Sequence, residues 1–184
     1  LVSARTAGNS RDEQGISLFV VDPNAAGVTR RVYATVDGRK ACELFLDNAQ
    51  GELLGEAGKA FDAIRYQSGR AIAALCAEAV GAMRTACDLT LEYLKTRKQF
   101  GVPIGKFQAL QHRAAHLYSE VEIARAVTVK AAQLVDGASE RADLMASVAK
   151  AKVAKVAGLA VREGVQMHGG IGMTDEYDIG LYMK

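Results

Sequence analysis

The stretch Thr96-Arg97-Lys98-Gln99-Phe100-Gly101 lies near the middle of the chain, between two long alanine-rich segments. It places two cations, an amide, an aromatic ring and a glycine in one short run. Because Gly101 and Pro103 follow the cations, we predict that a helix ends here. The helix dipole explains Lys and Arg at a helix C-terminus. It does not explain the amide, the ring and the glycine that come next.

Three side chains of this stretch have the chemistry of a phosphate-binding site. Arg97 offers a planar fork of donors that matches phosphate oxygens. Gln99 can form hydrogen bonds, and Phe100 offers a face for stacking. A solvated helix end is the competing interpretation, and for this stretch taken alone it is the more common outcome.

Helical periodicity dominates the chain from about Gly58 onward. The apolar spacing predicts helices over about 58–98, 107–135 and 140–167, and a last helix that begins near Asp175 or Glu176 and is cut off at Lys184. Asp136-Gly137 is predicted to end the second helix, and Ser139 to cap the third. Since the links are short, we expect an antiparallel up-down four-helix bundle.

The first fifty residues have the character of short strands. Runs at 16–21, 28–33 and 42–46 are β-rich and are bounded by turn residues, and Leu1–Thr6 also resembles a strand. We therefore predict an α+β, mainly α fold, with half of an antiparallel β-domain over residues 1–52 and the helical domain over residues 53–184. A half-sheet with open edges is a poor free-standing domain. This and the missing initiator Met indicate a fragment of a longer protein.

Composition excludes several classes of protein. The 184 residues carry a net charge of +2, which argues against a dedicated nucleic-acid surface. No apolar run has the length of roughly 20 residues that a membrane span needs, and no signal peptide is evident. Cys42, Cys76 and Cys87 have no metal-type spacing, and we interpret them as buried thiols in a reducing compartment, the cytoplasm.

A second candidate site is the glycine-rich turn at Gln166-Met167-His168-Gly169-Gly170. Backbone N–H groups at such a turn can line an anion, although a plain interhelical turn is the commoner case. His112 and His116 have the spacing of metal ligands on one helix face, but no third ligand is evident and we predict no metal site. No general base or nucleophile stands out.

Taken together, these segments resemble the acyl-CoA dehydrogenase family. The resemblance covers nearly the whole chain, and the order and spacing of its motifs also match. The matching segments are Leu54–Phe61, Arg97–Ile104, Phe107–Gln111 and Gln166–Gly172.

The resemblance implies an FAD site shared between subunits. The residue matching Arg97 meets the FAD pyrophosphate in that family. Other matching positions lie beside FAD, and those of the glycine-rich turn lie at its adenosine and pyrophosphate end. The residues implied to bind FAD are Arg97, Gln99, Phe100, Phe107, Gln108, Gln166, Met167, His168, Gly169 and Gly170. Arg70 matches an arginine at the acyl-CoA end of the cavity.

The resemblance also implies a reaction and partners. A carboxylate removes the α-proton of an acyl-CoA thioester, hydride leaves the β-carbon for FAD, and an electron-transfer flavoprotein reoxidises the flavin. The assembly implied is a dimer of dimers or a heterotetramer. Most of the family places its catalytic Glu beyond the position of Lys184, and a minority places it at the position of Gly69. The catalytic residue is therefore unknown. A partner subunit without that base, or a related oxidase, stays open as an alternative.

Overall fold

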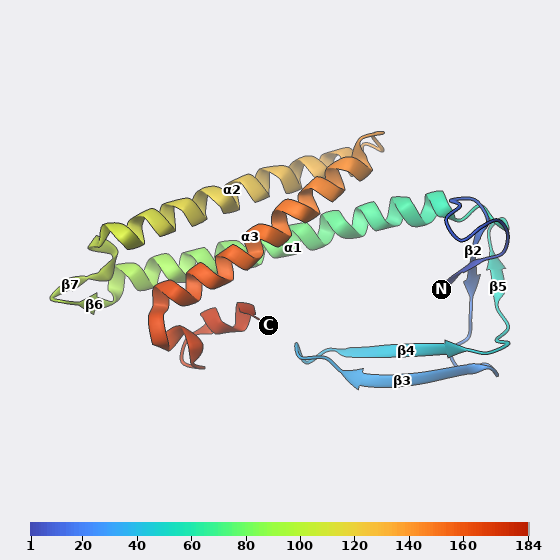
Figure 1. The fold of residues 1–184 in the computed structure, drawn as a ribbon, viewed down its shortest axis with the longest axis horizontal. Helices are drawn as coiled ribbons and strands as arrows, with labels where there is room; N and C mark the ends of the chain where they lie inside the picture. Colours follow the sequence, from blue (N-terminus) through green and yellow to red (C-terminus); the bar gives the residue numbers. More distant parts are fainter. Residues whose placement is uncertain (184) are drawn as a thin grey trace. The chain divides into compact units, whose positions relative to one another are not determined.

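The computed structural model describes residues 1–183 and divides the chain into two compact units, Leu1–Gln67 and Ser68 onward. Short antiparallel strands come first and long helices follow (Figure 1). The helices are α1 (Phe61–Thr96), α2 (Gln108–Asp136) and α3 (Ala142–His168). This confirms the predicted α+β, mainly α fold class, and each helix begins and ends within a few residues of its predicted limits.

The strands of the first unit pair with one another in antiparallel fashion. β1 (Val2–Arg5), β2 (Ile16–Val20) and β5 (Glu52–Leu54) form a sheet in the order β1-β2-β5. A separate hairpin joins β3 (Val28–Ala34) to β4 (Lys40–Leu46). The predicted strands are therefore confirmed as β1, β2, β3 and β4.

One hydrophobic core holds the helices of the second unit together. Each helix contributes buried residues at helical spacing, and alanine is frequent on α2 and α3. Because alanine is small, it allows two helix backbones to approach closely. The core members are Cys76, Val80, Met83, Cys87 and Leu94 on α1, Leu117, Val121, Ala124 and Ala131 on α2, and Ala149, Val153, Val156, Ala160 and Met167 on α3.

The link between α2 and α3 shows one correct prediction and one wrong one. Gly137 is the C-cap of α2, as predicted. Ser139 does not cap α3, because the helix begins at Ala142 and the cap position is Arg141. Ser139 instead closes the preceding turn: its carbonyl accepts from the Ala142 N–H at 2.9 Å, and its Oγ accepts from the Arg141 N–H at 3.3 Å.

The predicted fourth helix is wrong over the residues that the structure describes. Two 3-10 segments replace it, η2 (Gly169–Met173) and η3 (Asp178–Met183). Glycine disfavours an α-helix, and η2 holds Gly169, Gly170 and Gly172, whereas η3 holds Gly180. Between them the Thr174 hydroxyl donates to the Ile171 carbonyl at 2.7 Å and accepts from the Glu176 N–H at 3.4 Å. Such local bonds compete with helical ones. Lys184 lies outside the described residues.

The three cysteines differ in burial. Cys76 and Cys87 are buried on α1, but Cys42 is exposed on β4, so the prediction of a buried thiol is wrong there. An isolated two-stranded ribbon has too little neighbouring surface to cover both of its faces. In residues 1–183, no helix is long and apolar enough to cross a membrane.

Candidate functional site

The central stretch forms a tight hairpin directly after α1. The Arg97 N–H donates to the Tyr93 carbonyl at 2.9 Å, and the chain then turns into β6 (Lys98–Gln99) and β7 (Val102–Pro103). The two residues between the strands, Phe100 and Gly101, have φ values of 53° and 80°. Positive φ at both positions is typical of the tightest hairpin turns. The predicted helix end is therefore present, and a β-turn follows it immediately.

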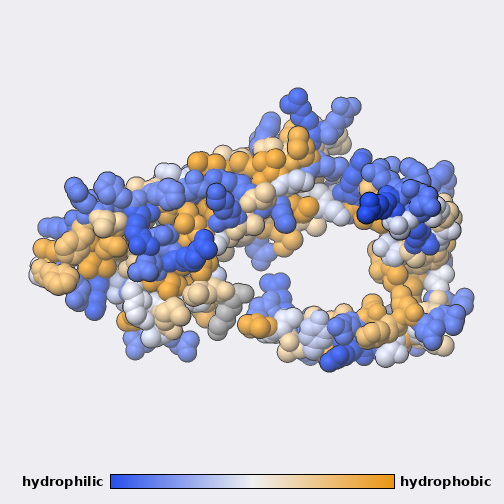
Figure 2. Space-filling model, viewed as in Figure 1, coloured by the Kyte–Doolittle hydropathy of each residue, from blue (hydrophilic) through white to orange (hydrophobic). Residues whose placement is uncertain are grey.

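Phe100 stands at the tip of this hairpin in a backbone conformation that is uncommon for a bulky residue. Its side chain is 91% exposed and meets the Phe107 ring edge-on, with 6.1 Å between centroids. Hydrophobic side chains are visible at this end of the unit in Figure 2. Strained backbone that presents an exposed ring is typical of a binding site rather than of a packing position.

The Arg97 guanidinium is available to a ligand. The residue is exposed, and its side chain has no hydrogen-bond or ion-pair partner among residues 1–183. Its carbonyl accepts from the Ile104 N–H at 2.8 Å, which holds the base of the hairpin. Gln99 and Gln108 are also exposed. The Arg97 cation and the Gln99 and Gln108 amides are thus held on ordered backbone, and the cation has no side-chain partner among residues 1–183.

The glycine-rich turn ends α3. Gly169 has φ 70° and ψ −149°, a conformation that residues with a side chain essentially do not adopt. A Cβ placed on Gly169 or Gly170 would meet nothing within 4 Å, so the backbone is open to a ligand at both positions. Gln166 is exposed, whereas Met167 and His168 are only 3% and 4% exposed.

The hairpin and the glycine-rich turn lie at the same end of the second unit (Figure 1). A ring contact joins them: Tyr93 and His168 stack with 4.4 Å between their centroids. The Tyr93 carbonyl also accepts from the Arg97 N–H, so Arg97 lies one helical turn after Tyr93. The Tyr93 ring in turn supports the glycine-rich turn through His168. Sequence reasoning missed Tyr93, although an aromatic residue one turn before Arg97 was a usable signal.

Arg70 is far from this cluster. It lies near the beginning of α1, and at 1.5 Å per residue it is about 40 Å along the helix from Arg97. Its neighbour Gly69 is buried, and a Cβ there would stand 3.6 Å from Oδ1 of Asp143 on α3. The structure therefore groups the predicted cofactor residues and leaves the predicted substrate residue separate from them.

Cys87, on α1 nearby, is not suited to nucleophilic chemistry. Burial, with a smaller contribution from the charge of Asp88, raises the pKa of its thiol to about 11. Since the thiolate is the reactive form, the thiol is inert near neutral pH. The chemistry available at this end of the unit is therefore binding by a cation, amides, rings and open backbone N–H groups.

The helical unit thus presents an arginine without a side-chain partner among residues 1–183 at the same end as an open glycine turn. The family model for the C-terminal domain of acyl-CoA dehydrogenase matches residues 61–184. The chain belongs to the acyl-CoA dehydrogenase family.

Known relatives show the extent of the similarity. Acyl-CoA dehydrogenase IpdE2 of Mycobacterium tuberculosis is 43% identical over 110 residues, which cover 60% of this chain and 33% of IpdE2. The probable acyl-CoA dehydrogenase YngJ of Bacillus subtilis is 32% identical over 192 residues, covering 100% of this chain and 50% of YngJ. The chain thus spans half or less of these relatives.

A solved structure shares the fold. A variant of the Tcur3481–Tcur3483 steroid ACAD superposes with a TM-score of 0.80 at 33% identity, over 91% of this chain and 45% of that one. The shared fold extends over both units, since the match covers nearly all of the chain.

Proposed function

We propose that the protein catalyses the FAD-dependent α,β-dehydrogenation of an acyl-CoA thioester to the trans-2-enoyl-CoA, and that this chain supplies part of the FAD site. The observation that carries the proposal is that the Arg97 guanidinium, unpartnered among residues 1–183, and the open backbone of Gly169 and Gly170 lie at the same end of the helical unit. A pyrophosphate is an anion with several acceptor oxygens, and both groups suit it.

The other residues of the cluster fit the remainder of FAD. Phe100 and Phe107 offer exposed apolar rings, and Gln99, Gln108 and Gln166 offer exposed amides that can donate or accept. Met167 is buried, so only its backbone is available to the cofactor. The His168 ring is buried as well and is held by Tyr93. When bound, FAD supplies the acceptor for the hydride that leaves the β-carbon.

Substrate, electron acceptor and assembly belong to the same proposal. Arg70, exposed on the early part of α1, is assigned to the acyl-CoA end of the cavity. We assign reoxidation of the flavin to an electron-transfer flavoprotein. The assembly is a dimer of dimers or a heterotetramer, in which this chain completes the FAD site of a neighbouring subunit. Such an arrangement explains why most of the cofactor residues, other than Met167 and His168, are exposed at the end of the unit.

A second candidate function is that of a partner subunit that lacks the catalytic base. Gly69, at one of the two positions where the family places that base, has no side chain. The paired name of the Tcur3481–Tcur3483 steroid ACAD also supports a two-polypeptide assembly. In this case the FAD-binding role of Arg97 is unchanged, and the proton is removed by a residue of the other polypeptide.

The flavin spectrum of the purified full-length protein tests both candidates. A dehydrogenase is yellow, and its oxidised flavin absorbance bleaches when an acyl-CoA is added without oxygen. A partner subunit shows flavin and bleaching only after co-purification with the second polypeptide. A colourless protein that takes up no FAD alone or with a co-expressed partner contradicts both.

A further inference from the structure

A cavity of about 320 Å³ lies between the C-terminal part of α1 and the segment that follows α3. It adjoins the glycine-rich turn, but the FAD proposal does not use it. Its polar and aromatic lining consists of Glu92, Tyr93, Thr96, His168, Glu176, Tyr177 and Asp178. The charge of this lining points to a ligand of a different class from FAD.

His168 presents an acceptor to this cavity. Its Nδ1 lies 2.7 Å from the Gly164 carbonyl oxygen. Because a carbonyl oxygen can only accept, Nδ1 carries the hydrogen, and Nε2 of the neutral ring is left as an acceptor. Nε2 has no partner among residues 1–183, although the residue is 4% exposed. Every described side-chain nitrogen or oxygen that is shut off from solvent has a hydrogen-bond partner. Because Nε2 has none, it must be open to solvent, and the cavity that His168 lines is the space it reaches.

The described lining carries three carboxylates and no Lys or Arg. Glu92, Glu176 and Asp178 make no ion pair within 4.0 Å among the described residues. Three negative charges and one acceptor nitrogen repel a phosphate and favour a cation that donates several hydrogen bonds. In residues 1–183, no group of three His, Cys, Asp or Glu residues is arranged to hold a metal ion. We therefore consider an organic cation that binds through hydrogen bonds and ring faces.

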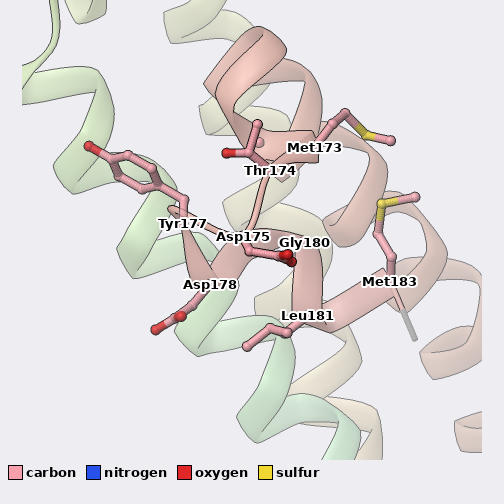
Figure 3. Close-up of a pocket in the computed structure, with 9 residues that line it drawn as sticks. Met173, Thr174, Asp175, Tyr177, Asp178, Gly180, Leu181 and Met183 are labelled. Carbon is pink, nitrogen blue, oxygen red and sulfur yellow. The ribbon is translucent and has the colours of Figure 1, made fainter. Parts of the chain in front are cut away.

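Three aromatic rings close one side of the cavity. Tyr93 stacks on His168 at 4.4 Å, and Tyr177 meets these two rings edge-on at 5.3 and 5.6 Å. Figure 3 shows Tyr177 and Asp178 on one side of their segment, with Met173 and Met183 on the other. A planar cation can stack on such rings while its edge donates to nearby acceptors.

We propose that this cavity binds a guanidinium group, either from an arginine side chain of a polypeptide or from a free alkylguanidinium. A guanidinium has a planar face for the tyrosine rings and a fork of N–H donors for Nε2 and the carboxylates at once. An ammonium group lacks the face, and a neutral amide lacks the charge. The inference does not depend on the proposed function, because it uses neither Arg97 nor the open glycine backbone.

Histidine-selective NMR of the full-length protein tests free binding. Ethylguanidinium should shift the imidazole signals of His168 in a saturable way, and the exposed His112 and His116 serve as references. Ethylurea is the neutral control of the same shape and should cause no shift. The Glu176→Gln variant should bind several-fold more weakly. An equal shift with ethylurea would overturn the proposal.

Thermal unfolding tests whether a polypeptide arginine already fills the cavity. If the cavity is empty, Glu176→Gln neutralises one of three unpaired carboxylates and so relieves their repulsion. The thermal unfolding midpoint should then rise or stay unchanged. If a guanidinium is present, the same change should lower the midpoint by roughly 2–4 °C. Asp175→Asn is the control, since Asp175 lies on the same segment but lines a different cavity. No NMR shift together with no lowering of the midpoint rules the proposal out.

Discussion

Arg97 and Phe100 are held in place by main-chain geometry and have few side-chain contacts of their own. The Arg97 backbone bonds to Tyr93 and Ile104, whereas its guanidinium has no partner in the described residues. Phe100 touches only the Phe107 ring among aromatic neighbours. Side chains that contribute little to the folded unit are the ones whose loss should affect ligand binding more than stability.

Replacing Arg97 by alanine should therefore weaken FAD binding and leave the fold intact. A hydrogen bond to a charged group contributes about 1.5–3 kcal/mol, so the dissociation constant should rise roughly 10- to 100-fold. Titration of the apo-protein with FAD, followed by flavin fluorescence, measures this. Arg84→Ala, at an exposed position on α1, is the control. Equal affinities for the two variants would remove Arg97 from the site.

Phe100→Asn should separate stability from binding. Asparagine tolerates the left-handed backbone of this position (φ 53°), so relief of strain should raise the free energy of unfolding by up to ~1 kcal/mol. The lost ring should weaken FAD binding about three- to tenfold. Denaturant unfolding and the same titration give the two values. A variant that loses stability and keeps its FAD affinity contradicts the role given to the ring.

At the scale of elements, the contact between α3 and η3 positions the segment after the glycine-rich turn. Ile179 of η3 is fully buried, and a Cβ on Gly164 would stand 2.7 Å from its Cδ1. Glycine at this point of α3 therefore makes room for the isoleucine. The His168 ring bonds to the carbonyl of the same glycine, so the packing of η3 and the orientation of the ring depend on one helical turn.

Gly164→Ala should destabilise the unit by about 1–3 kcal/mol, because the added methyl group overlaps Ile179. Gly158→Ala is a matched control on the same helix. Nothing lies within 4 Å of a Cβ there, so the change should stabilise by about 0.5–1 kcal/mol. Chemical denaturation measures both values. Shifts of the same sign in the two variants would mean that Gly164 does not accommodate Ile179.

Ion pairs between α2 and α3 should make stability depend on pH. A hydrogen bond from Lys152 Nζ at 2.7 Å lowers the pKa of Glu120 below its ordinary value of about 4.3. The unfolded chain then binds more protons than the folded one in this range. The stabilisation is complete above pH ~4.3 and is lost as the pH falls through the lower folded pKa.

Lys152→Met should remove that part of the acid dependence of unfolding. The measurement is the free energy of unfolding between pH 6 and pH 3, roughly the window that the lowered pKa defines. Lys150→Met, at an exposed position of α3, serves as control and should keep the wild-type acid dependence. If both variants lose stability on acidification in parallel with the wild type, the Glu120–Lys152 pair has no such role.

How far the sequence predicts each element depends on the physical signal available. The period of apolar residues located α1, α2 and α3, because each buries one face in a common core. Ser139 and the last helix were predicted wrongly, since local bonds of Ser139 and Thr174 replaced helical ones. The Phe100–Gly101 turn was also missed. A positive φ at phenylalanine follows from the pairing of β6 with β7 and cannot be inferred from its own side chain.

At the scale of the molecule, the chain covers 33% and 50% of the relatives reported above. The cofactor residues collect at one end of the helical unit, whereas Arg70 lies about 40 Å away along α1. The sequence motifs predict that these residues share one ligand, and the Tyr93–His168 contact joins the end of α1 to the glycine-rich turn. The catalytic base, the acyl chain and the domain division at residue 52 stay predictions or open questions of the whole protein.

We propose that the hairpin after α1 and the glycine turn after α3 hold one FAD pyrophosphate. A crystal structure of the full-length protein with FAD is the decisive test. We expect pyrophosphate oxygens about 2.7–3.2 Å from the Arg97 guanidinium, with the Gly169 and Gly170 backbone at the same end of the cofactor. A pyrophosphate bound by other residues, with Arg97 left in solvent, would contradict it.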